Sequence, residues 1–350
     1  MTMRIAHVIF SLQTGGAEHM LVDIINEQVS QAEVALFVLN NEVNPEIVGR
    51  LNSAVRCRTF GRREGSRNPV PVALFNAALL RGKFDVIHCH NLNMAALLLP
   101  SLRRKAMLTV HDTISTPENL TRYNRCFAIS YAVRDSVQTH AFTHCRVIQN
   151  GVNFNEIAER RVIPLRTGNF RILQAGRLRH KKKGQHVSIE ALRILNERGI
   201  HDVEIDFIGE GPSCSYLQKL AEELGVSSHV RFLGCKDRAY VYNNIQCYDL
   251  MVQPSVYEGF GLTIVEAMAA KVPVLASAIE GPMEVLDSGR YGFLFEKESA
   301  PDMADKIIHI MGIAPEAMRA SVDKAYDYAL ERFSVKRTAR DYLEEYRRKD

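Results

Sequence analysis

Short apolar runs alternate with stretches of helical composition along almost the whole chain, and this alternation constrains the fold more than any other feature. A connection between parallel strands needs a crossover of about a dozen residues or more, which is usually a helix. The apolar runs predict strands at 4–10, 34–39, 85–90, 106–111, 126–129 and 146–148, and then at 170–175, 203–208, 230–233, 250–253 and 274–276. We therefore expect an α/β protein built on parallel sheets.

The alternation is interrupted once, which divides the chain into two predicted domains. At 350 residues the chain exceeds the usual size of one domain. Residues 153–169 are charged and irregular, and they include Pro164 and Gly168. We expect a Rossmann-like domain at 1–168 and a second one at 169–350, facing each other across a deep cleft. The last segment, about 334–350, has apolar residues at helical spacing and is expected either to cross the domain junction or to cover its own domain.

The composition bears on the cellular compartment and on metal binding. No apolar run approaches the ~20 residues of a membrane span, and the first ten residues look like a strand, so a cytoplasmic protein is expected. The seven cysteines form no C-x-x-C pair and are expected to be free thiols. The run His88-Cys89-His90 is not predicted to bind a metal, because neighbours on a strand point to opposite faces. We expect neither a metal nor another cofactor.

The positive charge of the chain belongs to its first half. Residues 1–168 contain 19 Lys and Arg against 13 Asp and Glu, whereas the remainder contains 25 against 27. Part of the excess lies in Arg62, Arg63 and Arg67, and part in residues 103–105. These residues form either an ordinary solvated surface or a contact with an anionic membrane or a phosphate-bearing acceptor. Nucleic acid is not an expected partner, because no aromatic residues interleave with these charges.

The segment Glu258-Gly-Phe-Gly-Leu-Thr-Ile-Val-Glu266 joins a predicted strand to a predicted helix. Gly259 and Gly261 therefore fall in a strand-to-helix turn, where unpaired backbone N–H groups and the helix dipole favour an anion. The two carboxylates can bind hydroxyl groups while the amides between them hold a phosphate. This arrangement predicts a site for a sugar nucleotide. The alternative is that Glu258 is a solvated loop residue and Glu266 a surface residue of the helix.

Two cations occupy a second turn of this kind. Gly176-Arg177-Leu178 follows the first strand of the second half, and Lys183-Gly184 opens the next helix. Arginine offers a planar fork to two oxygens and lysine a compact charge, so this loop can bind a diphosphate and offset the charge on a departing one. A solvated basic turn is the alternative.

Three further candidates lie after predicted strands. His111 follows the run AMLTV, at the edge where open α/β sheets bind ligands. Gly16 and Gly211 occur in strand-to-helix turns, where the backbone can approach a ligand closely. A structural histidine and plain tight turns are the alternatives. The turn at Gly16 is not G-x-G-x-x-G, which weakens a dinucleotide-binding interpretation.

These motifs follow one another in an order that occurs in a known family. They are GGAE, IHCHN, TVHD, VIQNGVN, GRL with its KG, IGEGP, VRFLG and YEGFGLTIVEAMAAKVPVLAS. Together they resemble the retaining glycosyltransferases of GT-B family 4, also called glycosyl transferases group 1, over nearly the whole chain. One departure is Asn153, which replaces the aspartate of the family's NGVD, and no function is assigned to it.

The resemblance implies a GT-B fold whose last helix returns to the first domain. It implies that the second domain holds most of a nucleotide-sugar donor, with Arg177 and Lys183 on the diphosphate, Glu266 on the ribose and Glu258 near the sugar. The remaining assignments are the backbone amides of Phe260, Gly261 and Leu262 on the phosphates, Gly211 near the nucleotide, Gly16 on the diphosphate and His111 near the transferred sugar.

We therefore expect a retaining hexosyltransferase. It would move a hexose or N-acetylhexosamine from a nucleotide-diphosphate sugar, with a UDP-sugar favoured, to a hydroxyl of a lipid-linked polysaccharide or lipopolysaccharide. Its expected place is the cytoplasm, with peripheral contact at the cytoplasmic face of the inner membrane. The alternatives are a nucleotide-sugar 2-epimerase of the same fold and a sugar-nucleotide-binding protein without turnover.

Overall fold

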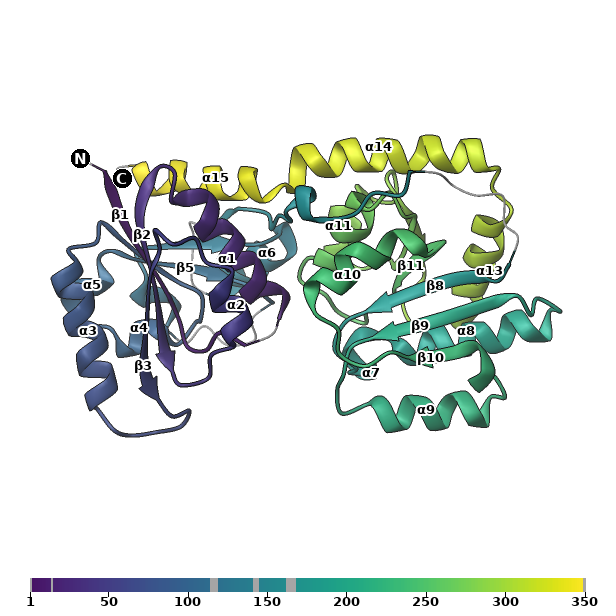
Figure 1. The fold of residues 1–350 in the computed structure, drawn as a ribbon, viewed down its shortest axis with the longest axis horizontal. Coiled ribbons are helices and arrows are strands. Elements are labelled where there is room, and N and C mark those ends of the chain that lie inside the picture. Colours follow the sequence, from purple (N-terminus) through teal and green to yellow (C-terminus); the bar gives the residue numbers. More distant parts are fainter. Residues whose placement is uncertain (1, 14, 114–118, 141–144, 162–167, 349–350) are drawn as a thin grey trace. The chain divides into compact units, whose positions relative to one another are not determined.

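The computed structural model describes residues 2–13, 15–113, 119–140, 145–161 and 168–348. The chain divides into two compact units, the first formed by residues 1–152 with 333–350 and the second by residues 153–332. Each unit contains one parallel sheet with helices packed on it (Figure 1). Among the described residues, no helix combines the length and the apolar character needed to cross a membrane.

The first unit is built on a seven-stranded sheet of order β3-β2-β1-β4-β5-β6-β7, with every pair parallel. Its strands are β1 Met3–Ile9, β2 Ala32–Asn40, β3 Arg56–Arg62, β4 Val86–Cys89, β5 Ala106–Val110, β6 Arg125–Ala128 and β7 Cys145–Val147. Its helices are α1 Gly16–Gln28, α2 Pro45–Gly49, α3 Val70–Gly82, α4 Met94–Leu97, α5 Pro100–Arg103, α6 Tyr131–His140 and α15 Val335–Arg347.

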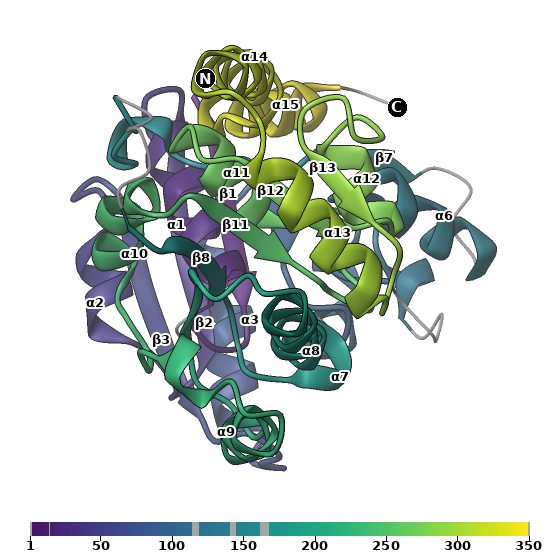
Figure 2. The ribbon, with the colours of Figure 1, turned by 90° about the vertical axis from the view of Figure 1, so that its right-hand side faces the viewer.

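The second unit is built on a six-stranded parallel sheet of order β10-β9-β8-β11-β12-β13. Its strands are β8 Phe170–Ala175, β9 Val203–Ile208, β10 Val230–Phe232, β11 Leu250–Gln253, β12 Val274–Ser277 and β13 Phe293–Phe295. Its helices are α7 His180–Lys183, α8 Gln185–Glu197, α9 Cys214–Glu223, α10 Arg238–Asn244, α11 Leu262–Ala269, α12 Glu280–Val285, α13 Ala300–Met311 and most of α14 Pro315–Phe333. Helices α8 and α13 lie side by side and share one apolar core with the sheet (Figure 2).

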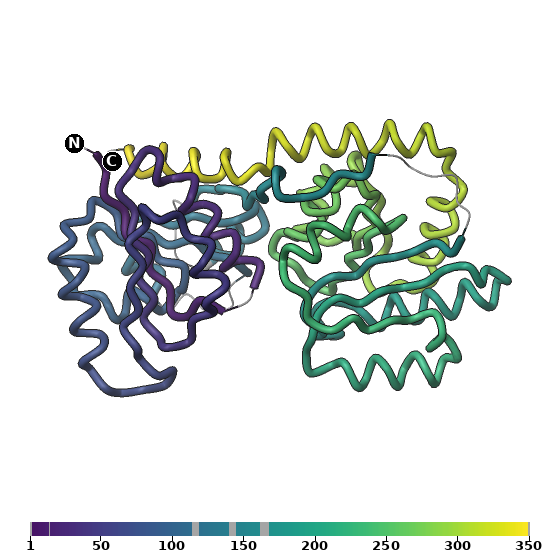
Figure 3. The backbone as a smooth tube through the Cα atoms, in the orientation of Figure 1, coloured from purple at the N-terminus to yellow at the C-terminus, as the bar shows by residue number. Residues whose placement is uncertain are grey.

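The last helix, α15, belongs to the first unit, where it lies beside α1 (Figure 3). Its apolar face includes Tyr342, Leu343 and Tyr346, all buried. The Tyr342 hydroxyl lies 2.9 Å from the hydroxyl of Thr109 on β5, and the Tyr346 hydroxyl bonds the ring of His88 on β4. The helical spacing of these residues therefore buries one face against the first sheet.

The second unit begins earlier than the sequence boundary at 168 and 169, because residues after Val152 bond to the second unit. The backbone N–H of Ala158 donates to Tyr242 and that of Arg160 to Ala270. The Arg160 guanidinium also pairs with Asp249 at 2.9 Å. Although residues 153–161 are irregular and charged, they belong to the second unit because their polar groups bond to it. Residues 162–167 lie outside the described part of the chain.

Two strands were not predicted from the sequence, β3 and β13, and each lies at the edge of its sheet. In β3 only Phe60 is buried, and most of the other positions are exposed, so the strand lacks an apolar run. An edge strand has one neighbour and can keep polar residues along its open side. Strand β13 has three residues, too few to establish a period.

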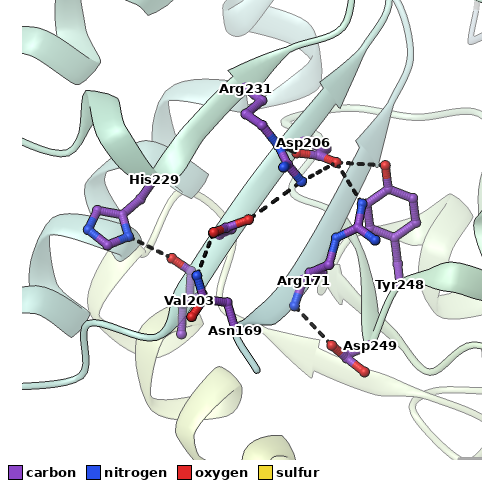
Figure 4. A network of polar contacts seen from close by, with 9 residues as sticks. Asn169, Arg171, Val203, Asp206, His229, Arg231, Tyr248 and Asp249 are labelled. Atoms are coloured by element: carbon purple, nitrogen blue, oxygen red, sulfur yellow. Dashed lines mark hydrogen bonds and ion pairs between the residues drawn. The ribbon is translucent and has the colours of Figure 1, made fainter. Parts of the chain in front are cut away.

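Asp206 ties three strands of the second sheet together by polar contacts (Figure 4). This buried carboxylate of β9 receives two hydrogen bonds from Arg231 of β10, at 2.6 and 3.0 Å, and one from Arg171 of β8 at 3.3 Å. The Tyr248 hydroxyl donates a fourth at 2.7 Å, and burial, together with this contact, raises the pKa of Tyr248. A buried carboxylate is tolerated when cations and donors surround it in this way.

Gly184, between α7 and α8, allows the loop after β8 to approach the loop after β11. It has φ +65°, and a Cβ there would lie 1.8 Å from the carbonyl oxygen of Pro254. Nearby, the backbone N–H of Val256 donates to the Lys182 carbonyl at 2.9 Å. These contacts bring Lys183 to the end of β11.

We predict that Gly184→Ala destabilises the protein more than Gly199→Ala. Gly199 also has positive φ, +81°, but a Cβ there would meet no atom within 4 Å. The Gly199 change should cost about 1–2 kcal/mol of backbone strain. Gly184→Ala should cost a further ~1–3 kcal/mol, because the Pro254 backbone must shift. Urea unfolding measures both, and equal losses would contradict the role given to the close approach.

Candidate functional site

Polar side chains gather where β8 and β11 end, in the middle of the second sheet. The two strands are neighbours, and the order of strands along the sheet reverses between them. Ligands of open α/β sheets bind outside the carboxyl ends of the strands at such a switch point. Arg177 and Lys183 follow β8, and Glu258 follows β11.

The Glu258 carboxylate is the centre of a hydrogen-bonded cluster. Its Oε2 atom accepts from Lys183 Nζ, from Gln253 Nε2 at 3.2 Å and from Ser255 Oγ at 3.5 Å. No hydrogen bond from the described residues reaches its Oε1 atom, which is therefore available to a ligand. The cluster can thus hold a cation at a defined place while leaving one carboxylate oxygen to accept from a hydroxyl.

Two buried glutamines position the members of this cluster. Gln253 is 5% exposed, donates to Glu258 and accepts from the hydroxyl of Thr263 on α11 at 2.7 Å. Gln174 donates to the carbonyl of Lys183 at 2.9 Å. Buried amides with both ends bonded hold their partners in one arrangement. The loop after β8 and the helix after β11 are therefore tied to the strands beneath them.

Helix α11 begins at this cluster. Its N-cap, Gly261, has φ +106°, a conformation that glycine adopts readily. Phe260 before it is 2% exposed and anchors the turn in the core, while Leu262 is the first helical residue. The first N–H groups of a helix have no partner within it, and with the dipole they favour an anion. The turn can therefore accept a phosphate.

The loops after β8 and β9 are packed backbone to backbone. The N–H of Leu178 donates to the carbonyl of Glu210 at 2.9 Å, and a Cβ on Gly211 would lie 2.3 Å from the Leu178 carbonyl oxygen. Gln185 donates to the carbonyl of Arg177 at 3.1 Å. The backbone of Arg177 is thus held while its side chain is exposed. Gly211 supports this loop.

Glu266 lies one turn into α11, where the hydroxyl of Tyr242 on α10 is 3.3 Å from its Oε1 atom. The structure therefore brings Lys183 and Glu258 into contact and places Gly261, Leu262 and Glu266 on one helix beside them. The remaining two candidate site residues, Gly16 and His111, lie in the first unit. Gly16 is the first residue of α1, and His111 follows β5.

Three buried histidines and the half-buried His111 lie across one face of the first sheet. His7 lies on β1, directly beside His88 of β4, and His90 and His111 follow β4 and β5. Burial lowers the pKa of His7 and of His111 to about 4. Burial and the neighbouring histidines lower the pKa of His88 and His90 as well. All four rings are therefore neutral near pH 7.

The ring nitrogens of His7, His88 and His90 lie within 4.8 Å of one another, close enough to surround a metal ion. Every one of these nitrogens already has a protein partner. His7 and His90 bond each other and then Gln28 and His111, while His88 lies between the hydroxyls of Thr109 and Tyr346. A metal would have to replace several of these hydrogen bonds, so we describe the group as a hydrogen-bonded network.

Sequence reasoning did not identify Gln253, Gln174, Tyr242 or His7. A signal was present for the two glutamines, because each follows apolar residues near the carboxyl end of a predicted strand. His7 also interrupts an apolar strand. Nothing in the sequence indicates that Tyr242 reaches Glu266, since the contact joins two helices far apart in the chain.

Comparison with known proteins adds two family matches. The sequence model of the family described as glycosyl transferases group 1 matches residues 155–326. That of the family described as glycosyltransferase family 4 matches residues 14–156. The two matches adjoin and together extend over most of the chain.

Individual relatives agree with these matches. An uncharacterized glycosyltransferase of Methanocaldococcus jannaschii is 31% identical over 237 residues, 58% of this chain and 60% of the relative. A phosphatidyl-myo-inositol mannosyltransferase of Mycolicibacterium smegmatis is 32% identical over 253 residues, 67% of this chain and 64% of the relative. The matches thus span less than two thirds of either relative's own length.

The fold also matches that of a solved structure. The Anabaena protein HepE, crystallised with UDP and glucose, superposes with a TM-score of 0.79 over 98% of this chain and 99% of that one, at 23% identity. Two Rossmann-like units of this kind form the GT-B fold, which confirms the fold class predicted from the sequence.

We predict that the unfolding free energy falls as the pH is lowered from 6.5 to 4. The folded-state pKa values of His7 and His111, about 4, lie below the unfolded value of 6.5, so the unfolded chain binds more protons in this window. Their stabilising contribution is complete above pH 6.5 and is lost at about 1.4 kcal/mol per pH unit for each histidine.

Urea unfolding at several pH values measures this loss. His111→Gln should reduce the slope against pH, whereas His201→Asn, at an exposed position, should leave it unchanged. Equal slopes in wild type and His111→Gln would show that His111 is not held neutral by burial.

Proposed function

Since the chain belongs to the glycosyl transferases group 1, we propose that it transfers a hexose or N-acetylhexosamine from a nucleotide-diphosphate sugar to a hydroxyl group with retention of configuration. A UDP-sugar is the favoured donor, in line with the UDP and glucose bound to the similar Anabaena protein. The observation that carries the proposal is the cluster at the start of α11, where Lys183 and Glu258 are paired beside a helix N-terminus.

The chemistry of the cluster suits the two ends of such a donor. The Lys183 ammonium and the exposed Arg177 guanidinium can bind the diphosphate together with the amides of Phe260, Gly261 and Leu262. The Oε1 atom of Glu258 can accept from a sugar hydroxyl, and Glu266 from the ribose. In the first unit, we propose contact of Gly16 with the diphosphate and of His111 with the transferred sugar. Gly211 holds the loop next to the nucleotide.

In the proposed reaction the bond between the anomeric carbon and the diphosphate oxygen breaks as the acceptor oxygen bonds that carbon on the same face. The hydroxyl proton passes to the departing phosphate oxygen. Arg177, Lys183 and the α11 N-terminus stabilise the negative charge that develops there, and their arrangement before the donor binds is what makes them effective. This route uses no dedicated base, and we propose that it uses no metal or other cofactor.

We propose a lipid-linked glycan, as in polysaccharide or lipopolysaccharide synthesis, as the acceptor. The phosphatidyl-myo-inositol mannosyltransferase among the relatives supports a lipid acceptor. The first unit has a surface that suits attachment to a membrane, such as the cytoplasmic face of the inner membrane. Helix α3 exposes Val70, Leu74 and Leu80 at 56, 50 and 48%.

Cations surround this apolar face of α3. Arg67 precedes the helix, and Arg81 and Lys83 lie at its end, all exposed. Leu99, 43% exposed, is joined to α3 because its backbone N–H donates to Asn76 at 2.9 Å, and Arg104 lies just beyond it. Apolar side chains within a basic rim match the chemistry of an anionic bilayer surface.

We predict that a nucleotide-sugar stabilises the protein against thermal unfolding. In a screen of UDP-, GDP- and ADP-sugars, a ligand at about 100 times its dissociation constant should add about 2.7 kcal/mol to the free energy of unfolding.

We predict that Arg177→Ala or Lys183→Ala raises the barrier to transfer by roughly 2.7–4 kcal/mol, the scale for removing one preorganised donor.

Lys219→Ala is the matched control, because among the described residues this exposed lysine pairs only with Glu223 on α9. It should transfer at the wild-type rate. Failure of every nucleotide to stabilise the protein would refute the proposal, and donor consumption without an acceptor would favour the epimerase.

We predict that Leu74→Ser weakens binding to vesicles containing phosphatidylglycerol by about tenfold or more, since burying one leucine contributes about 1.5–3 kcal/mol. Leu330→Ser is the control, because Leu330 is 41% exposed on α14 of the second unit. Vesicle flotation measures the binding. An equal loss in both variants, or binding indifferent to phosphatidylglycerol, would count against this surface.

A further inference from the structure

The buried His7 and His90 and the half-buried His111 form one continuous series of hydrogen bonds that ends at His111. His111 Nε2 lies 3.4 Å from His90 Nδ1, and His90 Nε2 lies 3.0 Å from His7 Nδ1. His7 Nε2 lies 2.8 Å from Oε1 of Gln28, at the end of α1. These hydrogen bonds therefore connect the ends of β5 and β4 with β1 and α1, entirely within the first unit.

The direction of this chain follows from Gln28. In this structure the Gln28 carboxamide turns its oxygen toward His7, and its Nε2 atom is buried without a partner among the described residues. Because a carboxamide oxygen only accepts, this orientation places the proton of the neutral His7 ring on Nε2. His7 Nδ1 then carries a lone pair and accepts from His90, whose proton is also on Nε2. By the same step His90 Nδ1 accepts from His111. All three rings are thus in the Nε2–H tautomer, because a neutral imidazole has one donor and one acceptor.

The last nitrogen of this series has no partner among the described residues. Nδ1 of His111 is buried and makes no hydrogen bond to the described residues. In the tautomer just derived, this atom carries a lone pair. A buried acceptor without a partner costs about 1–3 kcal/mol, so its retention calls for a role outside the packing of the first sheet. The same histidine follows β5, on the side of the sheet where open α/β sheets bind ligands.

We propose that Gln28, His7 and His90 are positioning residues that hold His111 in its Nε2–H tautomer, so that Nδ1 accepts a hydrogen bond from a hydroxyl of the transferred sugar. The contact with the sugar rests on the proposed function, whereas the tautomer does not. A neutral acceptor would bind a hydroxyl without placing positive charge beside the anomeric carbon, where an oxocarbenium-like transition state develops its own.

Among the described residues, the other titratable groups that contact these histidines are neutral side chains. They are His88 of β4 and the phenols Tyr342 and Tyr346 of α15, which bond Thr109 and His88. Burial raises the pKa of both tyrosines, so neither is ionised near pH 7. Asp23, the buried carboxylate of α1, pairs with Arg50 at 3.0 Å. The amide of Gln28 is therefore the group that sets the direction.

Nitrogen NMR of the full-length protein with ¹⁵N-labelled histidine tests the tautomer directly. His7, His90 and His111 should each show a protonated Nε2 and an unprotonated Nδ1 at pH 7, with assignments made by single substitutions. An Nδ1–H tautomer at His111 in the wild type would overturn the proposal without any variant.

Two substitutions at Gln28 form a matched pair. Gln28→Glu keeps an acceptor for His7 and should preserve the three tautomers, but its charge should move protonation of the chain to higher pH. Gln28→Leu removes the acceptor, so His111 should populate the Nδ1–H form. An unchanged His111 tautomer in folded Gln28→Leu would overturn the role of Gln28.

Titration with UDP-glucose and with UDP tests the contact with the sugar. UDP-glucose should shift the His111 Nδ1 resonance and UDP should not. Gln28→Leu should weaken UDP-glucose binding about five- to tenfold, the worth of one hydrogen bond, and leave UDP binding unchanged. Binding of UDP-glucose without any change at His111 would overturn the sugar contact alone. Absence of nucleotide binding would instead refute the proposed function and the sugar contact, while the tautomer would still be decided by the free protein.

Discussion

Both units depend on the requirement that parallel strands bond laterally along their whole length. In a parallel sheet every strand runs in the same direction, so the chain must cross back over the sheet between one strand and the next. The carboxyl ends of all the strands therefore lie on one side of the sheet. The sheet orders β3-β2-β1-β4 and β9-β8-β11-β12 each contain one reversal, and at that point neighbouring loops diverge. Lys183 and Glu258, which are far apart in sequence, come into contact because they follow the two strands at the reversal in the second sheet.

Buried polar side chains near the ends of the central strands are the second shared feature. In the second unit Gln253 bonds Glu258 and Gln174 bonds Lys183, and in the first unit His7 bonds His90, which in turn bonds His111. An apolar residue at such a position would pack well but could not orient a neighbour. A buried polar group must find its partners, and in doing so it selects one arrangement of the loop.

The two units also differ in where their charged side chains lie. In the second unit, buried Asp206 is surrounded by Arg171, Arg231 and Tyr248, so opposite charges meet within the sheet (Figure 4). In the first unit the buried histidines and tyrosines are neutral, the buried Asp23 pairs with Arg50, and many of the cations are exposed around α3. The excess positive charge of the first half therefore remains at the surface, where it can act on an anionic partner.

The sequence by itself determined the fold class, most of the strands, the burial of the α15 face and the candidate residues, because these follow from local periodicity and from turn chemistry. It did not reveal β3 or β13, whose place at an edge removes the need for an apolar run. Nor did it reveal that residues 153–161 join the second unit, since their partners Tyr242, Asp249 and Ala270 lie far along the chain. Only the tertiary structure decided which side chains bond one another at the strand ends, such as Gln253 with Thr263 or His111 with His90. Such pairs depend on the register between strands and on the closure of distant loops, and a linear pattern contains neither.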